Sequence, residues 1–489
     1  MNSLGLLRAL RNTPIRSMSS YTTSSAASPF TRAVVSAMRK LYPEPLADKS
    51  FDNTGRKQVA SYLRAGALTI AAVLLEAPFD PLRRQMNSVL LTVDLTRAVA
   101  TEAIENKDCC VVAYHPIIFR GLKSLTLADP QQSSLLRLAL EGISVYCPHT
   151  AVDAVPGGMA DWLCDIVAGT LQEPHPEQKT SASDAEPILS QTAQPPDGDS
   201  QPNTQKQKTD LQPKSEDDVF NDEPPSSSPT KNATTNRPHM KRAYSRPIYP
   251  QRSSTPTTNS PPINPSTLAH SRTVLHPSSQ ASISLTHDPP SYPQDRTGSG
   301  RLITFHTPQP LTHLIERIAL GVGTPKGFPV AIPQSRHVES IHIKTVGICP
   351  GSGGSVLKDC GADLIFTGEL SHHDALAVTE RGGCVVTLFH SNSERGYLHG
   401  VMRGLLQEEV RRQWGRVRDE HSAGKAMSES AAAVVGMGGG RDDGEGGVGG
   451  EELEDALADE GVSVEVSRVD RDPYGIVVLQ GSEVEGMKI

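Results

Sequence analysis

The chain has 489 residues, which is long enough for two or three domains with buried cores. Only 37% of the residues are hydrophobic and 4% aromatic, and there are 40 glycines and 38 prolines, so much of the chain is not expected to be core. The net charge of −8 gives no reason to expect direct nucleic-acid binding, and no run of about 18 apolar residues predicts a membrane span.

Residues 1–43 have the composition of a mitochondrial presequence. They contain arginine and lysine but no acidic residue, the first of which is Glu44, and serine and threonine are abundant after Ser17. This pattern is typical of a transit peptide and predicts a mitochondrial protein. An ordinary basic N-terminus is the alternative, and it would leave the protein in the cytoplasm or nucleus.

Residues 44–172 are predicted to form an N-terminal α/β part. Strand patterns at 89–95, 110–115 and 143–147 are separated by helix patterns at 97–105 and 133–141, and a further helix is expected at 158–168. Helix-length segments between strands indicate crossover connections and a largely parallel or mixed sheet with helices packed on it.

One segment near the start of this part, residues 56–72, interrupts the pattern on either side of it. Residues 51–55 and the apolar run that begins at Val73 look like two sides of one junction, separated by residues 56–72. We therefore hypothesise that 56–72 is a retained intron or gene-model error. A tryptic peptide that joins Gly55 to Val73 would support this hypothesis.

Residues 173–300 are predicted to be a disordered insert. They hold 21 of the 38 prolines, and serine, threonine, glutamine and asparagine fill most of the rest. Such a segment cannot bury enough apolar surface to offset its ordering entropy. Basic residues around Lys241 and Arg246 could attract a protein partner, although a solvated linker is the simpler expectation.

The α/β pattern resumes in residues 301–420. Strands are expected at 345–349, 364–367 and 384–389, and helices at 355–360, 371–381 and 394–412. Residues 350–354 form a glycine-rich turn before a helix, which suits either an anion site or a plain turn. Residues 421–460 are low-complexity, and 461–489 contain a last strand at 462–467 and a tail.

Histidine and carboxylate side chains stand at the ends of several expected strands. His115 and Asp153 follow two strands of the first part, and His390 and Glu394 follow a strand of the second. The carboxyl ends of strands are where open α/β sheets hold ligands, and a separation of four residues at a helix start brings His390 and Glu394 to one side. Together they predict a metal site assembled from both ends of the chain.

Five motifs, in this order, resemble the Nif-three-like family, whose members are described as dinuclear metal centre proteins or type 2 GTP cyclohydrolase I homologues. The motifs are Asp-Asn-Thr-Gly (52–55), Tyr-His-Pro-Ile-Ile-Phe (114–119), His-Thr-Ala-Val-Asp (149–153), Gly-Glu-Leu-Ser-His-His (368–373) and His-Ser-Asn-Ser-Glu-Arg (390–395). The resemblance covers roughly 40–170, 301–415 and the last strand. It implies a two-part α/β fold with mixed sheets and flanking helices, here split by the long insert.

The resemblance also implies the site residues. The metal ligands would be His115, Asp153, His390 and Glu394, and the supporting or acid/base residues would be Glu369 and His373. One or two divalent ions per chain are expected, and such ligands do not distinguish Zn, Fe, Mn, Co or Ni. Tyr114 stands where the family has a first histidine, and a phenol is a poor metal ligand, so a mononuclear or weakly dinuclear site is the alternative.

Two functions follow from the resemblance. The first is a metal-dependent hydrolase of a small phosphorylated or nucleotide-like substrate, of cyclohydrolase or phosphoesterase type. The second is a non-catalytic, metal-stabilised regulatory protein that binds a transcription-cofactor partner, with the insert as a recruiting segment. Four ligands for up to two metals would leave coordination positions open, which favours chemistry. Ring-like homo-oligomers, commonly hexamers, are also implied.

Overall fold

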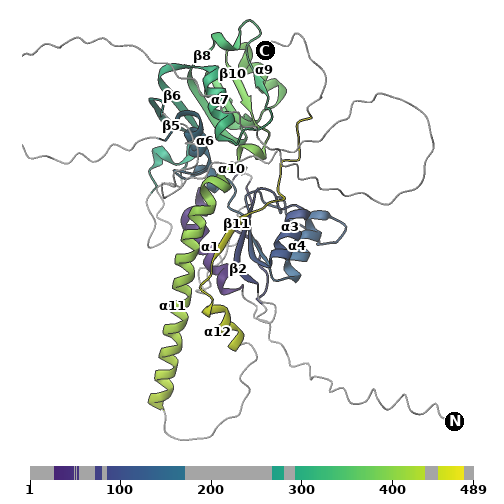
Figure 1. The fold of residues 1–489 in the computed structure, drawn as a ribbon, viewed down its shortest axis with the longest axis vertical. Coiled ribbons are helices and arrows are strands. Elements are labelled where there is room, and N and C mark those ends of the chain that lie inside the picture. Colours follow the sequence, from purple (N-terminus) through teal and green to yellow (C-terminus); the bar gives the residue numbers. More distant parts are fainter. Residues whose placement is uncertain are drawn as a thin grey trace, which may run out of the picture. The chain divides into compact units, whose positions relative to one another are not determined.

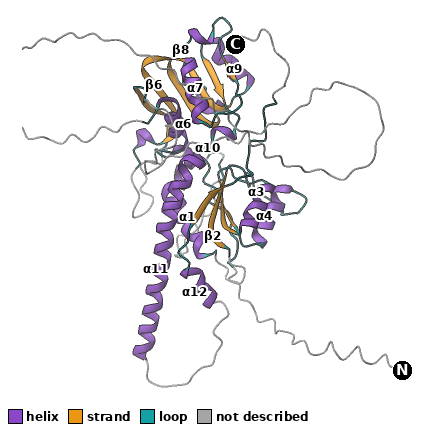
Figure 2. Cartoon of the chain, in the orientation of Figure 1, coloured by secondary structure: helices purple, strands orange, loops and turns teal. Residues whose placement is uncertain are grey.

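Two β-sheets with helices on both faces make up the described part of the chain (Figures 1 and 2). The structure, a computed structural model, describes residues 27–48, 50, 52–53, 72–79, 85–170, 267–279, 292–435 and 450–477. All of these residues belong to one compact unit. The predicted mixed α/β fold with two sheets and flanking helices is therefore confirmed.

The first sheet has five strands in the order β1-β4-β3-β2-β11. The four strands β4, β3, β2 and β11 run parallel, and β1 pairs antiparallel with β4 at one edge. The strands are β1 (Val73–Leu75), β2 (Met86–Thr92), β3 (Asp108–Ala113), β4 (Ser144–Tyr146) and β11 (Ser463–Val466). The last predicted strand of the chain thus completes the first sheet.

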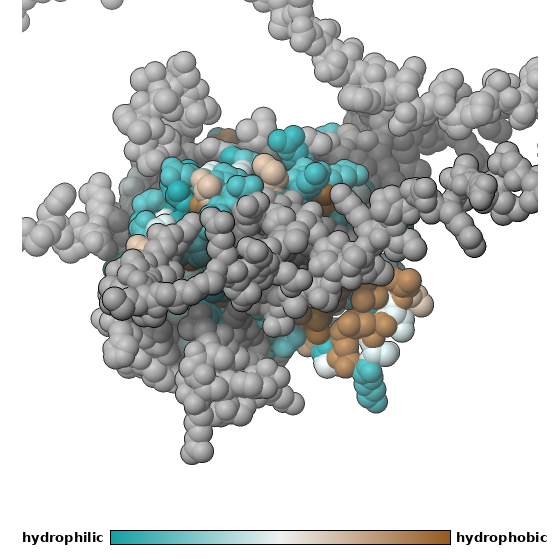
Figure 3. Space-filling view, turned by 90° about the horizontal axis from the view of Figure 1, so that it is seen from below, coloured by the Kyte–Doolittle hydropathy of each residue, from teal (hydrophilic) through white to brown (hydrophobic). Residues whose placement is uncertain are grey.

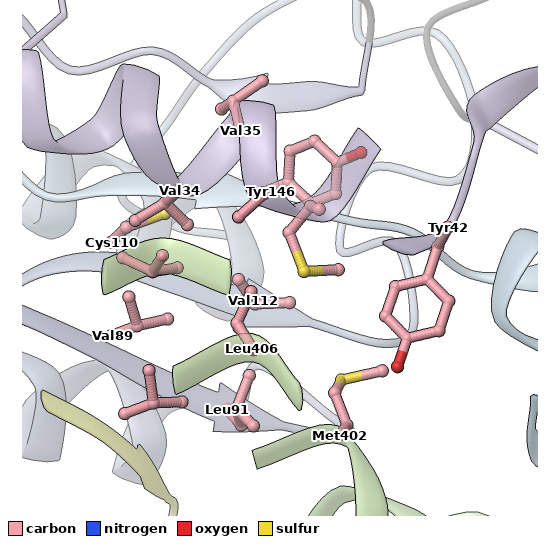
Figure 4. Packing of buried hydrophobic residues seen from close by; sticks show 14 of the residues in the cluster. Val34, Val35, Tyr42, Val89, Leu91, Cys110, Val112, Tyr146, Met402 and Leu406 are labelled. Atoms are coloured by element: carbon pink, nitrogen blue, oxygen red, sulfur yellow. The ribbon is translucent and has the colours of Figure 1, made fainter. Parts of the chain in front are cut away.

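Alternate residues of this sheet face two different helical layers, as the pleat of a strand requires. Leu90, Val111 and Val145 pack with α3 (Arg97–Asn106) and α4 (Pro130–Leu140). The intervening residues pack with α1 (Pro29–Leu41) and α11 (Arg403–Val435), and Figure 4 shows Val34 and Leu406 of these helices among them. Burial on both faces explains why these strands are continuous apolar runs in the sequence.

The second sheet has six strands in the order β5-β6-β8-β9-β10-β7. Its centre, β8-β9-β10, is parallel, while β5, β6 and β7 pair antiparallel. The strands are β5 (His270–Pro277), β6 (Gly298–Pro310), β7 (Val330–Ala331), β8 (His342–Ser352), β9 (Leu364–Glu369) and β10 (Cys384–Thr387). The parallel centre places the ends of β8, β9 and β10 at one edge, where the motifs of residues 350–395 begin.

Helices also cover both faces of the second sheet. Apolar residues of α6 (Met159–Ala168) and α7 (Leu311–Gly321) share one core cluster with the strands, and those of α8 (Gly354–Leu357) and α9 (His372–Glu380) share the other. The remaining helices are α5 (Thr150–Ala154), α10 (Arg395–Tyr397) and α12 (Gly450–Ala458), and a π-helical turn, η6 (Leu398–Met402), joins α10 to α11.

Local sequence signals explain where several helices begin. The Thr96 hydroxyl accepts a hydrogen bond from the Val99 amide at the start of α3, and Ser371 caps α9 through the Asp374 amide. The Asp129 carboxylate accepts from two amides at the start of α4. Each cap satisfies backbone donors that have no partner within the helix.

Three expected boundaries differ from the structure. Helix α1 lies within residues 1–43, and its apolar face is buried in the first core, so the folded part begins before residue 44. Strand β5 lies within residues 173–300, so the second part begins before residue 301. Helix α11 continues past the expected end at residue 412 to Val435 and α12 follows it, so helices extend into the low-complexity segment 421–460.

Some expectations fall on residues that the structure does not describe. Residues 1–26, nearly all of 56–72, and residues 171–266 and 280–291 lie outside the described residues. The presequence, the retained intron and the disorder of the insert therefore stay predictions.

Figure 3 shows hydrophobic residues gathered at one edge of this view, while most other described residues there are hydrophilic. Four large apolar side chains are exposed in the segment between His115 and α4, namely Phe119, Leu122, Leu125 and Leu127. None of the described helices is long and apolar enough to cross a membrane.

Candidate metal centre

His390 and Glu394 lie at the end of β10 on one tight turn. The chain leaves the strand, enters the 3₁₀ turn η5 (Ser391–Ser393), and continues into α10. This turn brings Nε2 of His390 to 3.4 Å from Oε1 of Glu394. The structure therefore places the two groups on one side of the turn, as their spacing predicts.

His115 reaches the same carboxylate from the first sheet. It follows β3, and its Nε2 lies 3.4 Å from Oε2 of Glu394. Its backbone is held by a hydrogen bond from its amide to the Val93 carbonyl. The two imidazoles pack edge to face with ring centroids 5.1 Å apart. One carboxylate thus stands between histidines contributed by the two sheets.

These three residues form a donor set that fits a divalent cation. Candidate ligand atoms of His115, His390 and Glu394 all lie within 4.8 Å of one another. Glu394 is only 1% exposed, and its Oε2 accepts no hydrogen bond from any residue that the structure describes. A buried carboxylate oxygen left in this way is costly unless a positive charge compensates it. Imidazole nitrogen with carboxylate oxygen suits zinc and other transition metals.

A carboxylate orients each imidazole from behind. Nδ1 of His115 lies 2.9 Å from Oδ1 of Asp94, and Nδ1 of His390 lies 2.9 Å from Oε1 of Glu369. Because Nδ1 is engaged in both rings, Nε2 is the nitrogen that faces Glu394. This is the usual arrangement behind a histidine that ligates a metal.

The glycine at position 351 of the glycine-rich turn is needed because the backbone there passes close to the cluster. Its φ is +60°, and a Cβ atom there would stand 2.6 Å from Oε1 of Glu394 and 2.9 Å from Nε2 of His390. Its amide donates to the Ser393 hydroxyl. The turn therefore lets the backbone approach the cluster, in a conformation that glycine adopts without strain.

Asp153 lies beside the cluster but is engaged by Tyr114. The phenol donates to the Asp153 carboxylate, with its oxygen 2.9 and 3.0 Å from the two carboxylate oxygens. Burial and the charge of Glu394 raise the pKa of Asp153 well above its usual range. Burial and the charges of Asp153 and Glu394 also raise the pKa of Tyr114, so the phenol keeps its proton. Tyr114 thus acts as a hydrogen-bond donor to the expected ligand.

The charge balance of the cluster favours a cation. Burial alone would lower the pKa of His115, but the Glu394 charge and the Asp94 hydrogen bond raise it to about 10. Asp94 stays ionised beside it, because the contact with His115 lowers its pKa although burial opposes this. A proton on His115 and a divalent cation would compensate the same carboxylates, so cation binding is expected to displace the proton.

Of the two residues expected to assist chemistry, Glu369 lies at the cluster and His373 does not contact it among the described residues. Glu369 contacts His390 and has a side chain 52% exposed, so it borders the cluster and is open to solvent. His373 is exposed on α9, where its ring packs against His372 at 5.3 Å. Among the described residues no contact joins His373 to the cluster.

A pair of a histidine and an aspartate next to the cluster, His149 with Asp52, was not expected from the sequence. Nδ1 of His149 lies 2.7 Å from the buried carboxylate of Asp52, which also accepts from the Thr150 hydroxyl at 2.6 Å. The His149 ring packs against Tyr114 and His115 with centroids 5.5 and 5.7 Å away. His149 adopts φ +36°, which is rare for a residue other than glycine.

Asp94 is the missed residue that a sequence signal could have indicated. It lies two residues after the end of β2, and the ends of parallel strands meet at one edge of a sheet. The Asp52 pairing has no comparable local signal, because its partner is almost a hundred residues away.

Similarity to known proteins identifies the family of this chain. The family described as Duf34/NIF3 (NGG1p interacting factor 3) matches residues 79–417. Protein NIF3 homolog of Schizosaccharomyces pombe is 34% identical over 366 residues, which cover 75% of this chain and 84% of the relative. NGG1-interacting factor 3 of Saccharomyces cerevisiae is 27% identical over 379 residues, which cover 77% and 90%. A solved Bacillus cereus protein related to NIF3 has 15% identity and a TM-score of 0.45, over 91% of this chain and 98% of that one.

The family match spans more than half of the chain, and the fission-yeast relative exceeds 30% identity over most of both proteins. The chain is therefore a eukaryotic member of the Duf34/NIF3 family.

Proposed function

We propose that this protein is a metal-dependent hydrolase of a small phosphorylated or nucleotide-like substrate. The observation that carries the proposal is the buried Glu394 carboxylate, which stands between two oriented imidazoles and keeps one oxygen free of hydrogen bonds from described residues. His115, His390 and Glu394 would hold the cation. Asp153 would join them if Tyr114 releases it.

The residues around the ligands have separate roles in this proposal. Asp94 and Glu369 orient the two imidazoles and increase their basicity. A bound divalent cation would supply Lewis acidity toward a phosphoryl or ring oxygen of the substrate. Glu369 has a more exposed side chain than His390, His115, Asp94 or Glu394, so we assign it proton transfer to or from the substrate. The same role for His373 stays a prediction.

The first test is metal content per chain, measured by elemental analysis on wild type, Glu394→Ala and Glu408→Gln. Glu408 is an exposed glutamate that pairs with Arg412 on α11, so it is a matched control. We expect one to two metal ions per chain in wild type and control, and a clear loss in Glu394→Ala with an unchanged circular dichroism spectrum. Wild type that binds no added divalent metal would contradict the metal centre.

The second test is hydrolysis of p-nitrophenyl phosphate, its diester and GTP. We expect metal-dependent turnover in wild type and a loss of at least ~100-fold in folded Asp153→Ala. Full metal occupancy without turnover of any of these substrates would contradict the hydrolase while leaving the metal site intact.

A non-catalytic regulatory role is the second candidate. It is favoured by the name of the budding-yeast relative, NGG1-interacting factor 3, and by the exposed apolar residues between His115 and α4. Binding to the counterpart of NGG1 that survives in Glu394→Ala but is lost in Leu125→Lys would support it. No binding by wild type would contradict it.

Two further expectations are proposals that the same preparation can test. We propose that the protein forms homo-oligomers, with a hexamer as the expected size, and that it resides in mitochondria. Light scattering on the purified chain measures the first, and microscopy of the full-length chain with and without residues 1–26 measures the second.

A further inference from the structure

The segment that follows β11, residues 467–474, contacts both loops that carry the candidate metal ligands. We call it the C-terminal clamp. It begins where the Ser467 amide donates to the Leu91 carbonyl at 2.8 Å, at the edge of the first sheet. Its side chains then reach the turn at the end of β10. No residue of the clamp belongs to the ligand cluster itself.

Asp470 holds the loop that carries His115. Its Oδ2 accepts a hydrogen bond from the Val93 amide at 2.7 Å. The carbonyl of the same Val93 accepts from the His115 amide at 2.9 Å, and the next residue, Asp94, orients the His115 ring. Asp470 therefore contacts Val93, which binds the backbone of His115 and directly precedes the carboxylate that orients the His115 ring.

The same Asp470 oxygen pairs with Arg395, the residue after Glu394. The guanidinium also donates to the Ser391 hydroxyl at 2.8 Å, so it spans the turn between His390 and Glu394. The side chains of Asp470 and Arg395 are only 1% and 7% exposed. In a site of low polarity a charge-assisted contact of this kind is strong and directional.

Asp472 holds the start of the turn. Its Oδ2 accepts from the Ser391 amide at 3.0 Å and from the Ser391 hydroxyl at 2.7 Å. Its Oδ1 accepts from the Tyr474 amide at 2.9 Å, which fixes the carboxylate relative to the clamp backbone. Ser391 directly follows His390, so this contact helps to fix the position of the His390 backbone after β10.

We propose that Asp470 and Asp472 are positioning residues that set the separation of His115 from His390 and Glu394. The two ligand-bearing loops belong to different sheets, and the clamp joins them through one connected set of buried contacts. Metal–ligand distances tolerate deviations of only about 0.2 Å, so small shifts between the loops reduce affinity. The proposal rests on the metal centre of the proposed function, not on its hydrolase activity.

The experiment compares wild type, Asp470→Asn, Asp472→Ala and Glu465→Gln on the full chain. Glu465 is a matched control because it lies in β11, just before the clamp, and its half-exposed carboxylate pairs with Arg403. Co²⁺ is titrated into each protein, and the visible absorption spectrum at saturation reports the coordination geometry. The thermal midpoint of each metal-free protein is measured in parallel.

We expect roughly 10- to 100-fold weaker Co²⁺ binding and an altered spectrum in both clamp variants, with the control unchanged. A merely structural role would lower the thermal midpoint and leave the spectrum of the saturated protein as in wild type. Affinity within about twofold of wild type and the same spectrum in a folded clamp variant would overturn the proposal. Wild type that binds no Co²⁺ would overturn the metal centre and the clamp together.

Hydrogen exchange on wild type gives a readout that does not depend on the folding of any variant. Asp470→Asn leaves Arg395 buried without its carboxylate, and that change endangers folding. Peptides that cover residues 467–474 should exchange more slowly when Co²⁺ is bound. Exchange there that is insensitive to Co²⁺, while peptides with His390 respond, would contradict a coupling between clamp and ligands.

Discussion

At the level of single residues, Tyr114 decides how much of the expected ligand set is free. Its hydroxyl satisfies both oxygens of Asp153, which would otherwise be a buried carboxylate beside Glu394. Removal of this hydrogen bond would leave a buried polar group unsatisfied, so the phenol stabilises the metal-free protein. The same contact competes with a cation for Asp153.

Replacement of Tyr114 should therefore separate stability from metal binding. We expect Tyr114→Phe to lower the free energy of unfolding of the metal-free protein by ~1–3 kcal/mol and to increase the stabilisation by added Mn²⁺. Tyr146→Phe is the control, because the buried Tyr146 hydroxyl makes no hydrogen bond with described residues and its loss should change little. Urea unfolding with and without Mn²⁺ measures both. An equal effect of the two substitutions would contradict the role of Tyr114.

The raised pKa values predict how pH acts on the metal-free protein. His115 has a folded-state pKa of about 10 against an ordinary 6.5, so its stabilisation is complete below 6.5 and is lost as pH rises toward 10. The pKa of Asp153 is also raised, and its ionisation opposes folding in the same direction. We expect the free energy of unfolding to fall between pH 7 and 9, by at most ~1.4 kcal/mol per pH unit for each proton. His115→Gln should flatten this slope in urea titrations.

Metal affinity should change with pH in the opposite sense. The cation must displace the His115 proton, so apparent affinity rises with pH and protons are released on binding. Calorimetric titration in buffers of different ionisation enthalpy counts these protons. An affinity that is constant from pH 6 to 9 would contradict the charge balance described for the cluster.

At the level of elements, α1 belongs to the folded core. Phe30 packs edge to face on Trp414 of α11 with ring centroids 5.4 Å apart, and both side chains are almost fully buried. Phe30, Val34 and Met38 recur every four residues and form one apolar helix face. Their spacing was visible in the sequence, but the basic and serine-rich composition around them indicated a presequence.

This packing limits where a presequence can end. A chain that starts at residue 27 should unfold like wild type, whereas one that starts at residue 44 loses α1. Removal of the Phe30 side chain alone is expected to cost ~3–5 kcal/mol, so the shorter chain should be insoluble or much less stable. Thermal unfolding of the two chains tests this, and mass spectrometry of the mature protein should place any cleavage before residue 27. A stable chain that starts at residue 44 would contradict the assignment.

At the level of the whole molecule, elements are exchanged between the two halves of the sequence. Helix α6 precedes the insert but packs on the second sheet, and α11 and β11 come late but pack on the first. The ends of the undescribed segment 171–266 lie together, because the Leu268 amide donates to the Ala168 carbonyl at 2.8 Å. The described residues on either side of that segment are therefore neighbours in the fold.

Deletion of residues 171–266 is therefore expected to preserve the fold and the metal site. With a linker of four glycine and serine residues in their place, loop closure becomes easier by at most ~3 kcal/mol, so stability should stay equal or rise. The urea midpoint and the metal content per chain measure the outcome. A folded deletion protein without metal would show that the segment contributes to the site.

The sequence by itself determined the strands of the two parallel centres, the helices between them, and the groups that meet over a short range. Hydrophobic periodicity and turn residues act within a few positions, so the strands of both parallel centres and the helices between them could be predicted. His390 and Glu394 were predictable for the same reason, because four residues across one turn bring them together. Strand β5 was not predicted, because the composition of residues 173–300 was averaged over a long segment rich in proline and serine.

Only the tertiary structure decided how the cluster is completed. The engagement of Asp153 by Tyr114, the Asp52–His149 pair and the contact of Asp470 with Arg395 join segments that no local pattern relates. These contacts depend on how the strand ends of two sheets and a late C-terminal segment converge. That convergence follows from packing of buried faces, which is a property of the whole chain and not of any window of it.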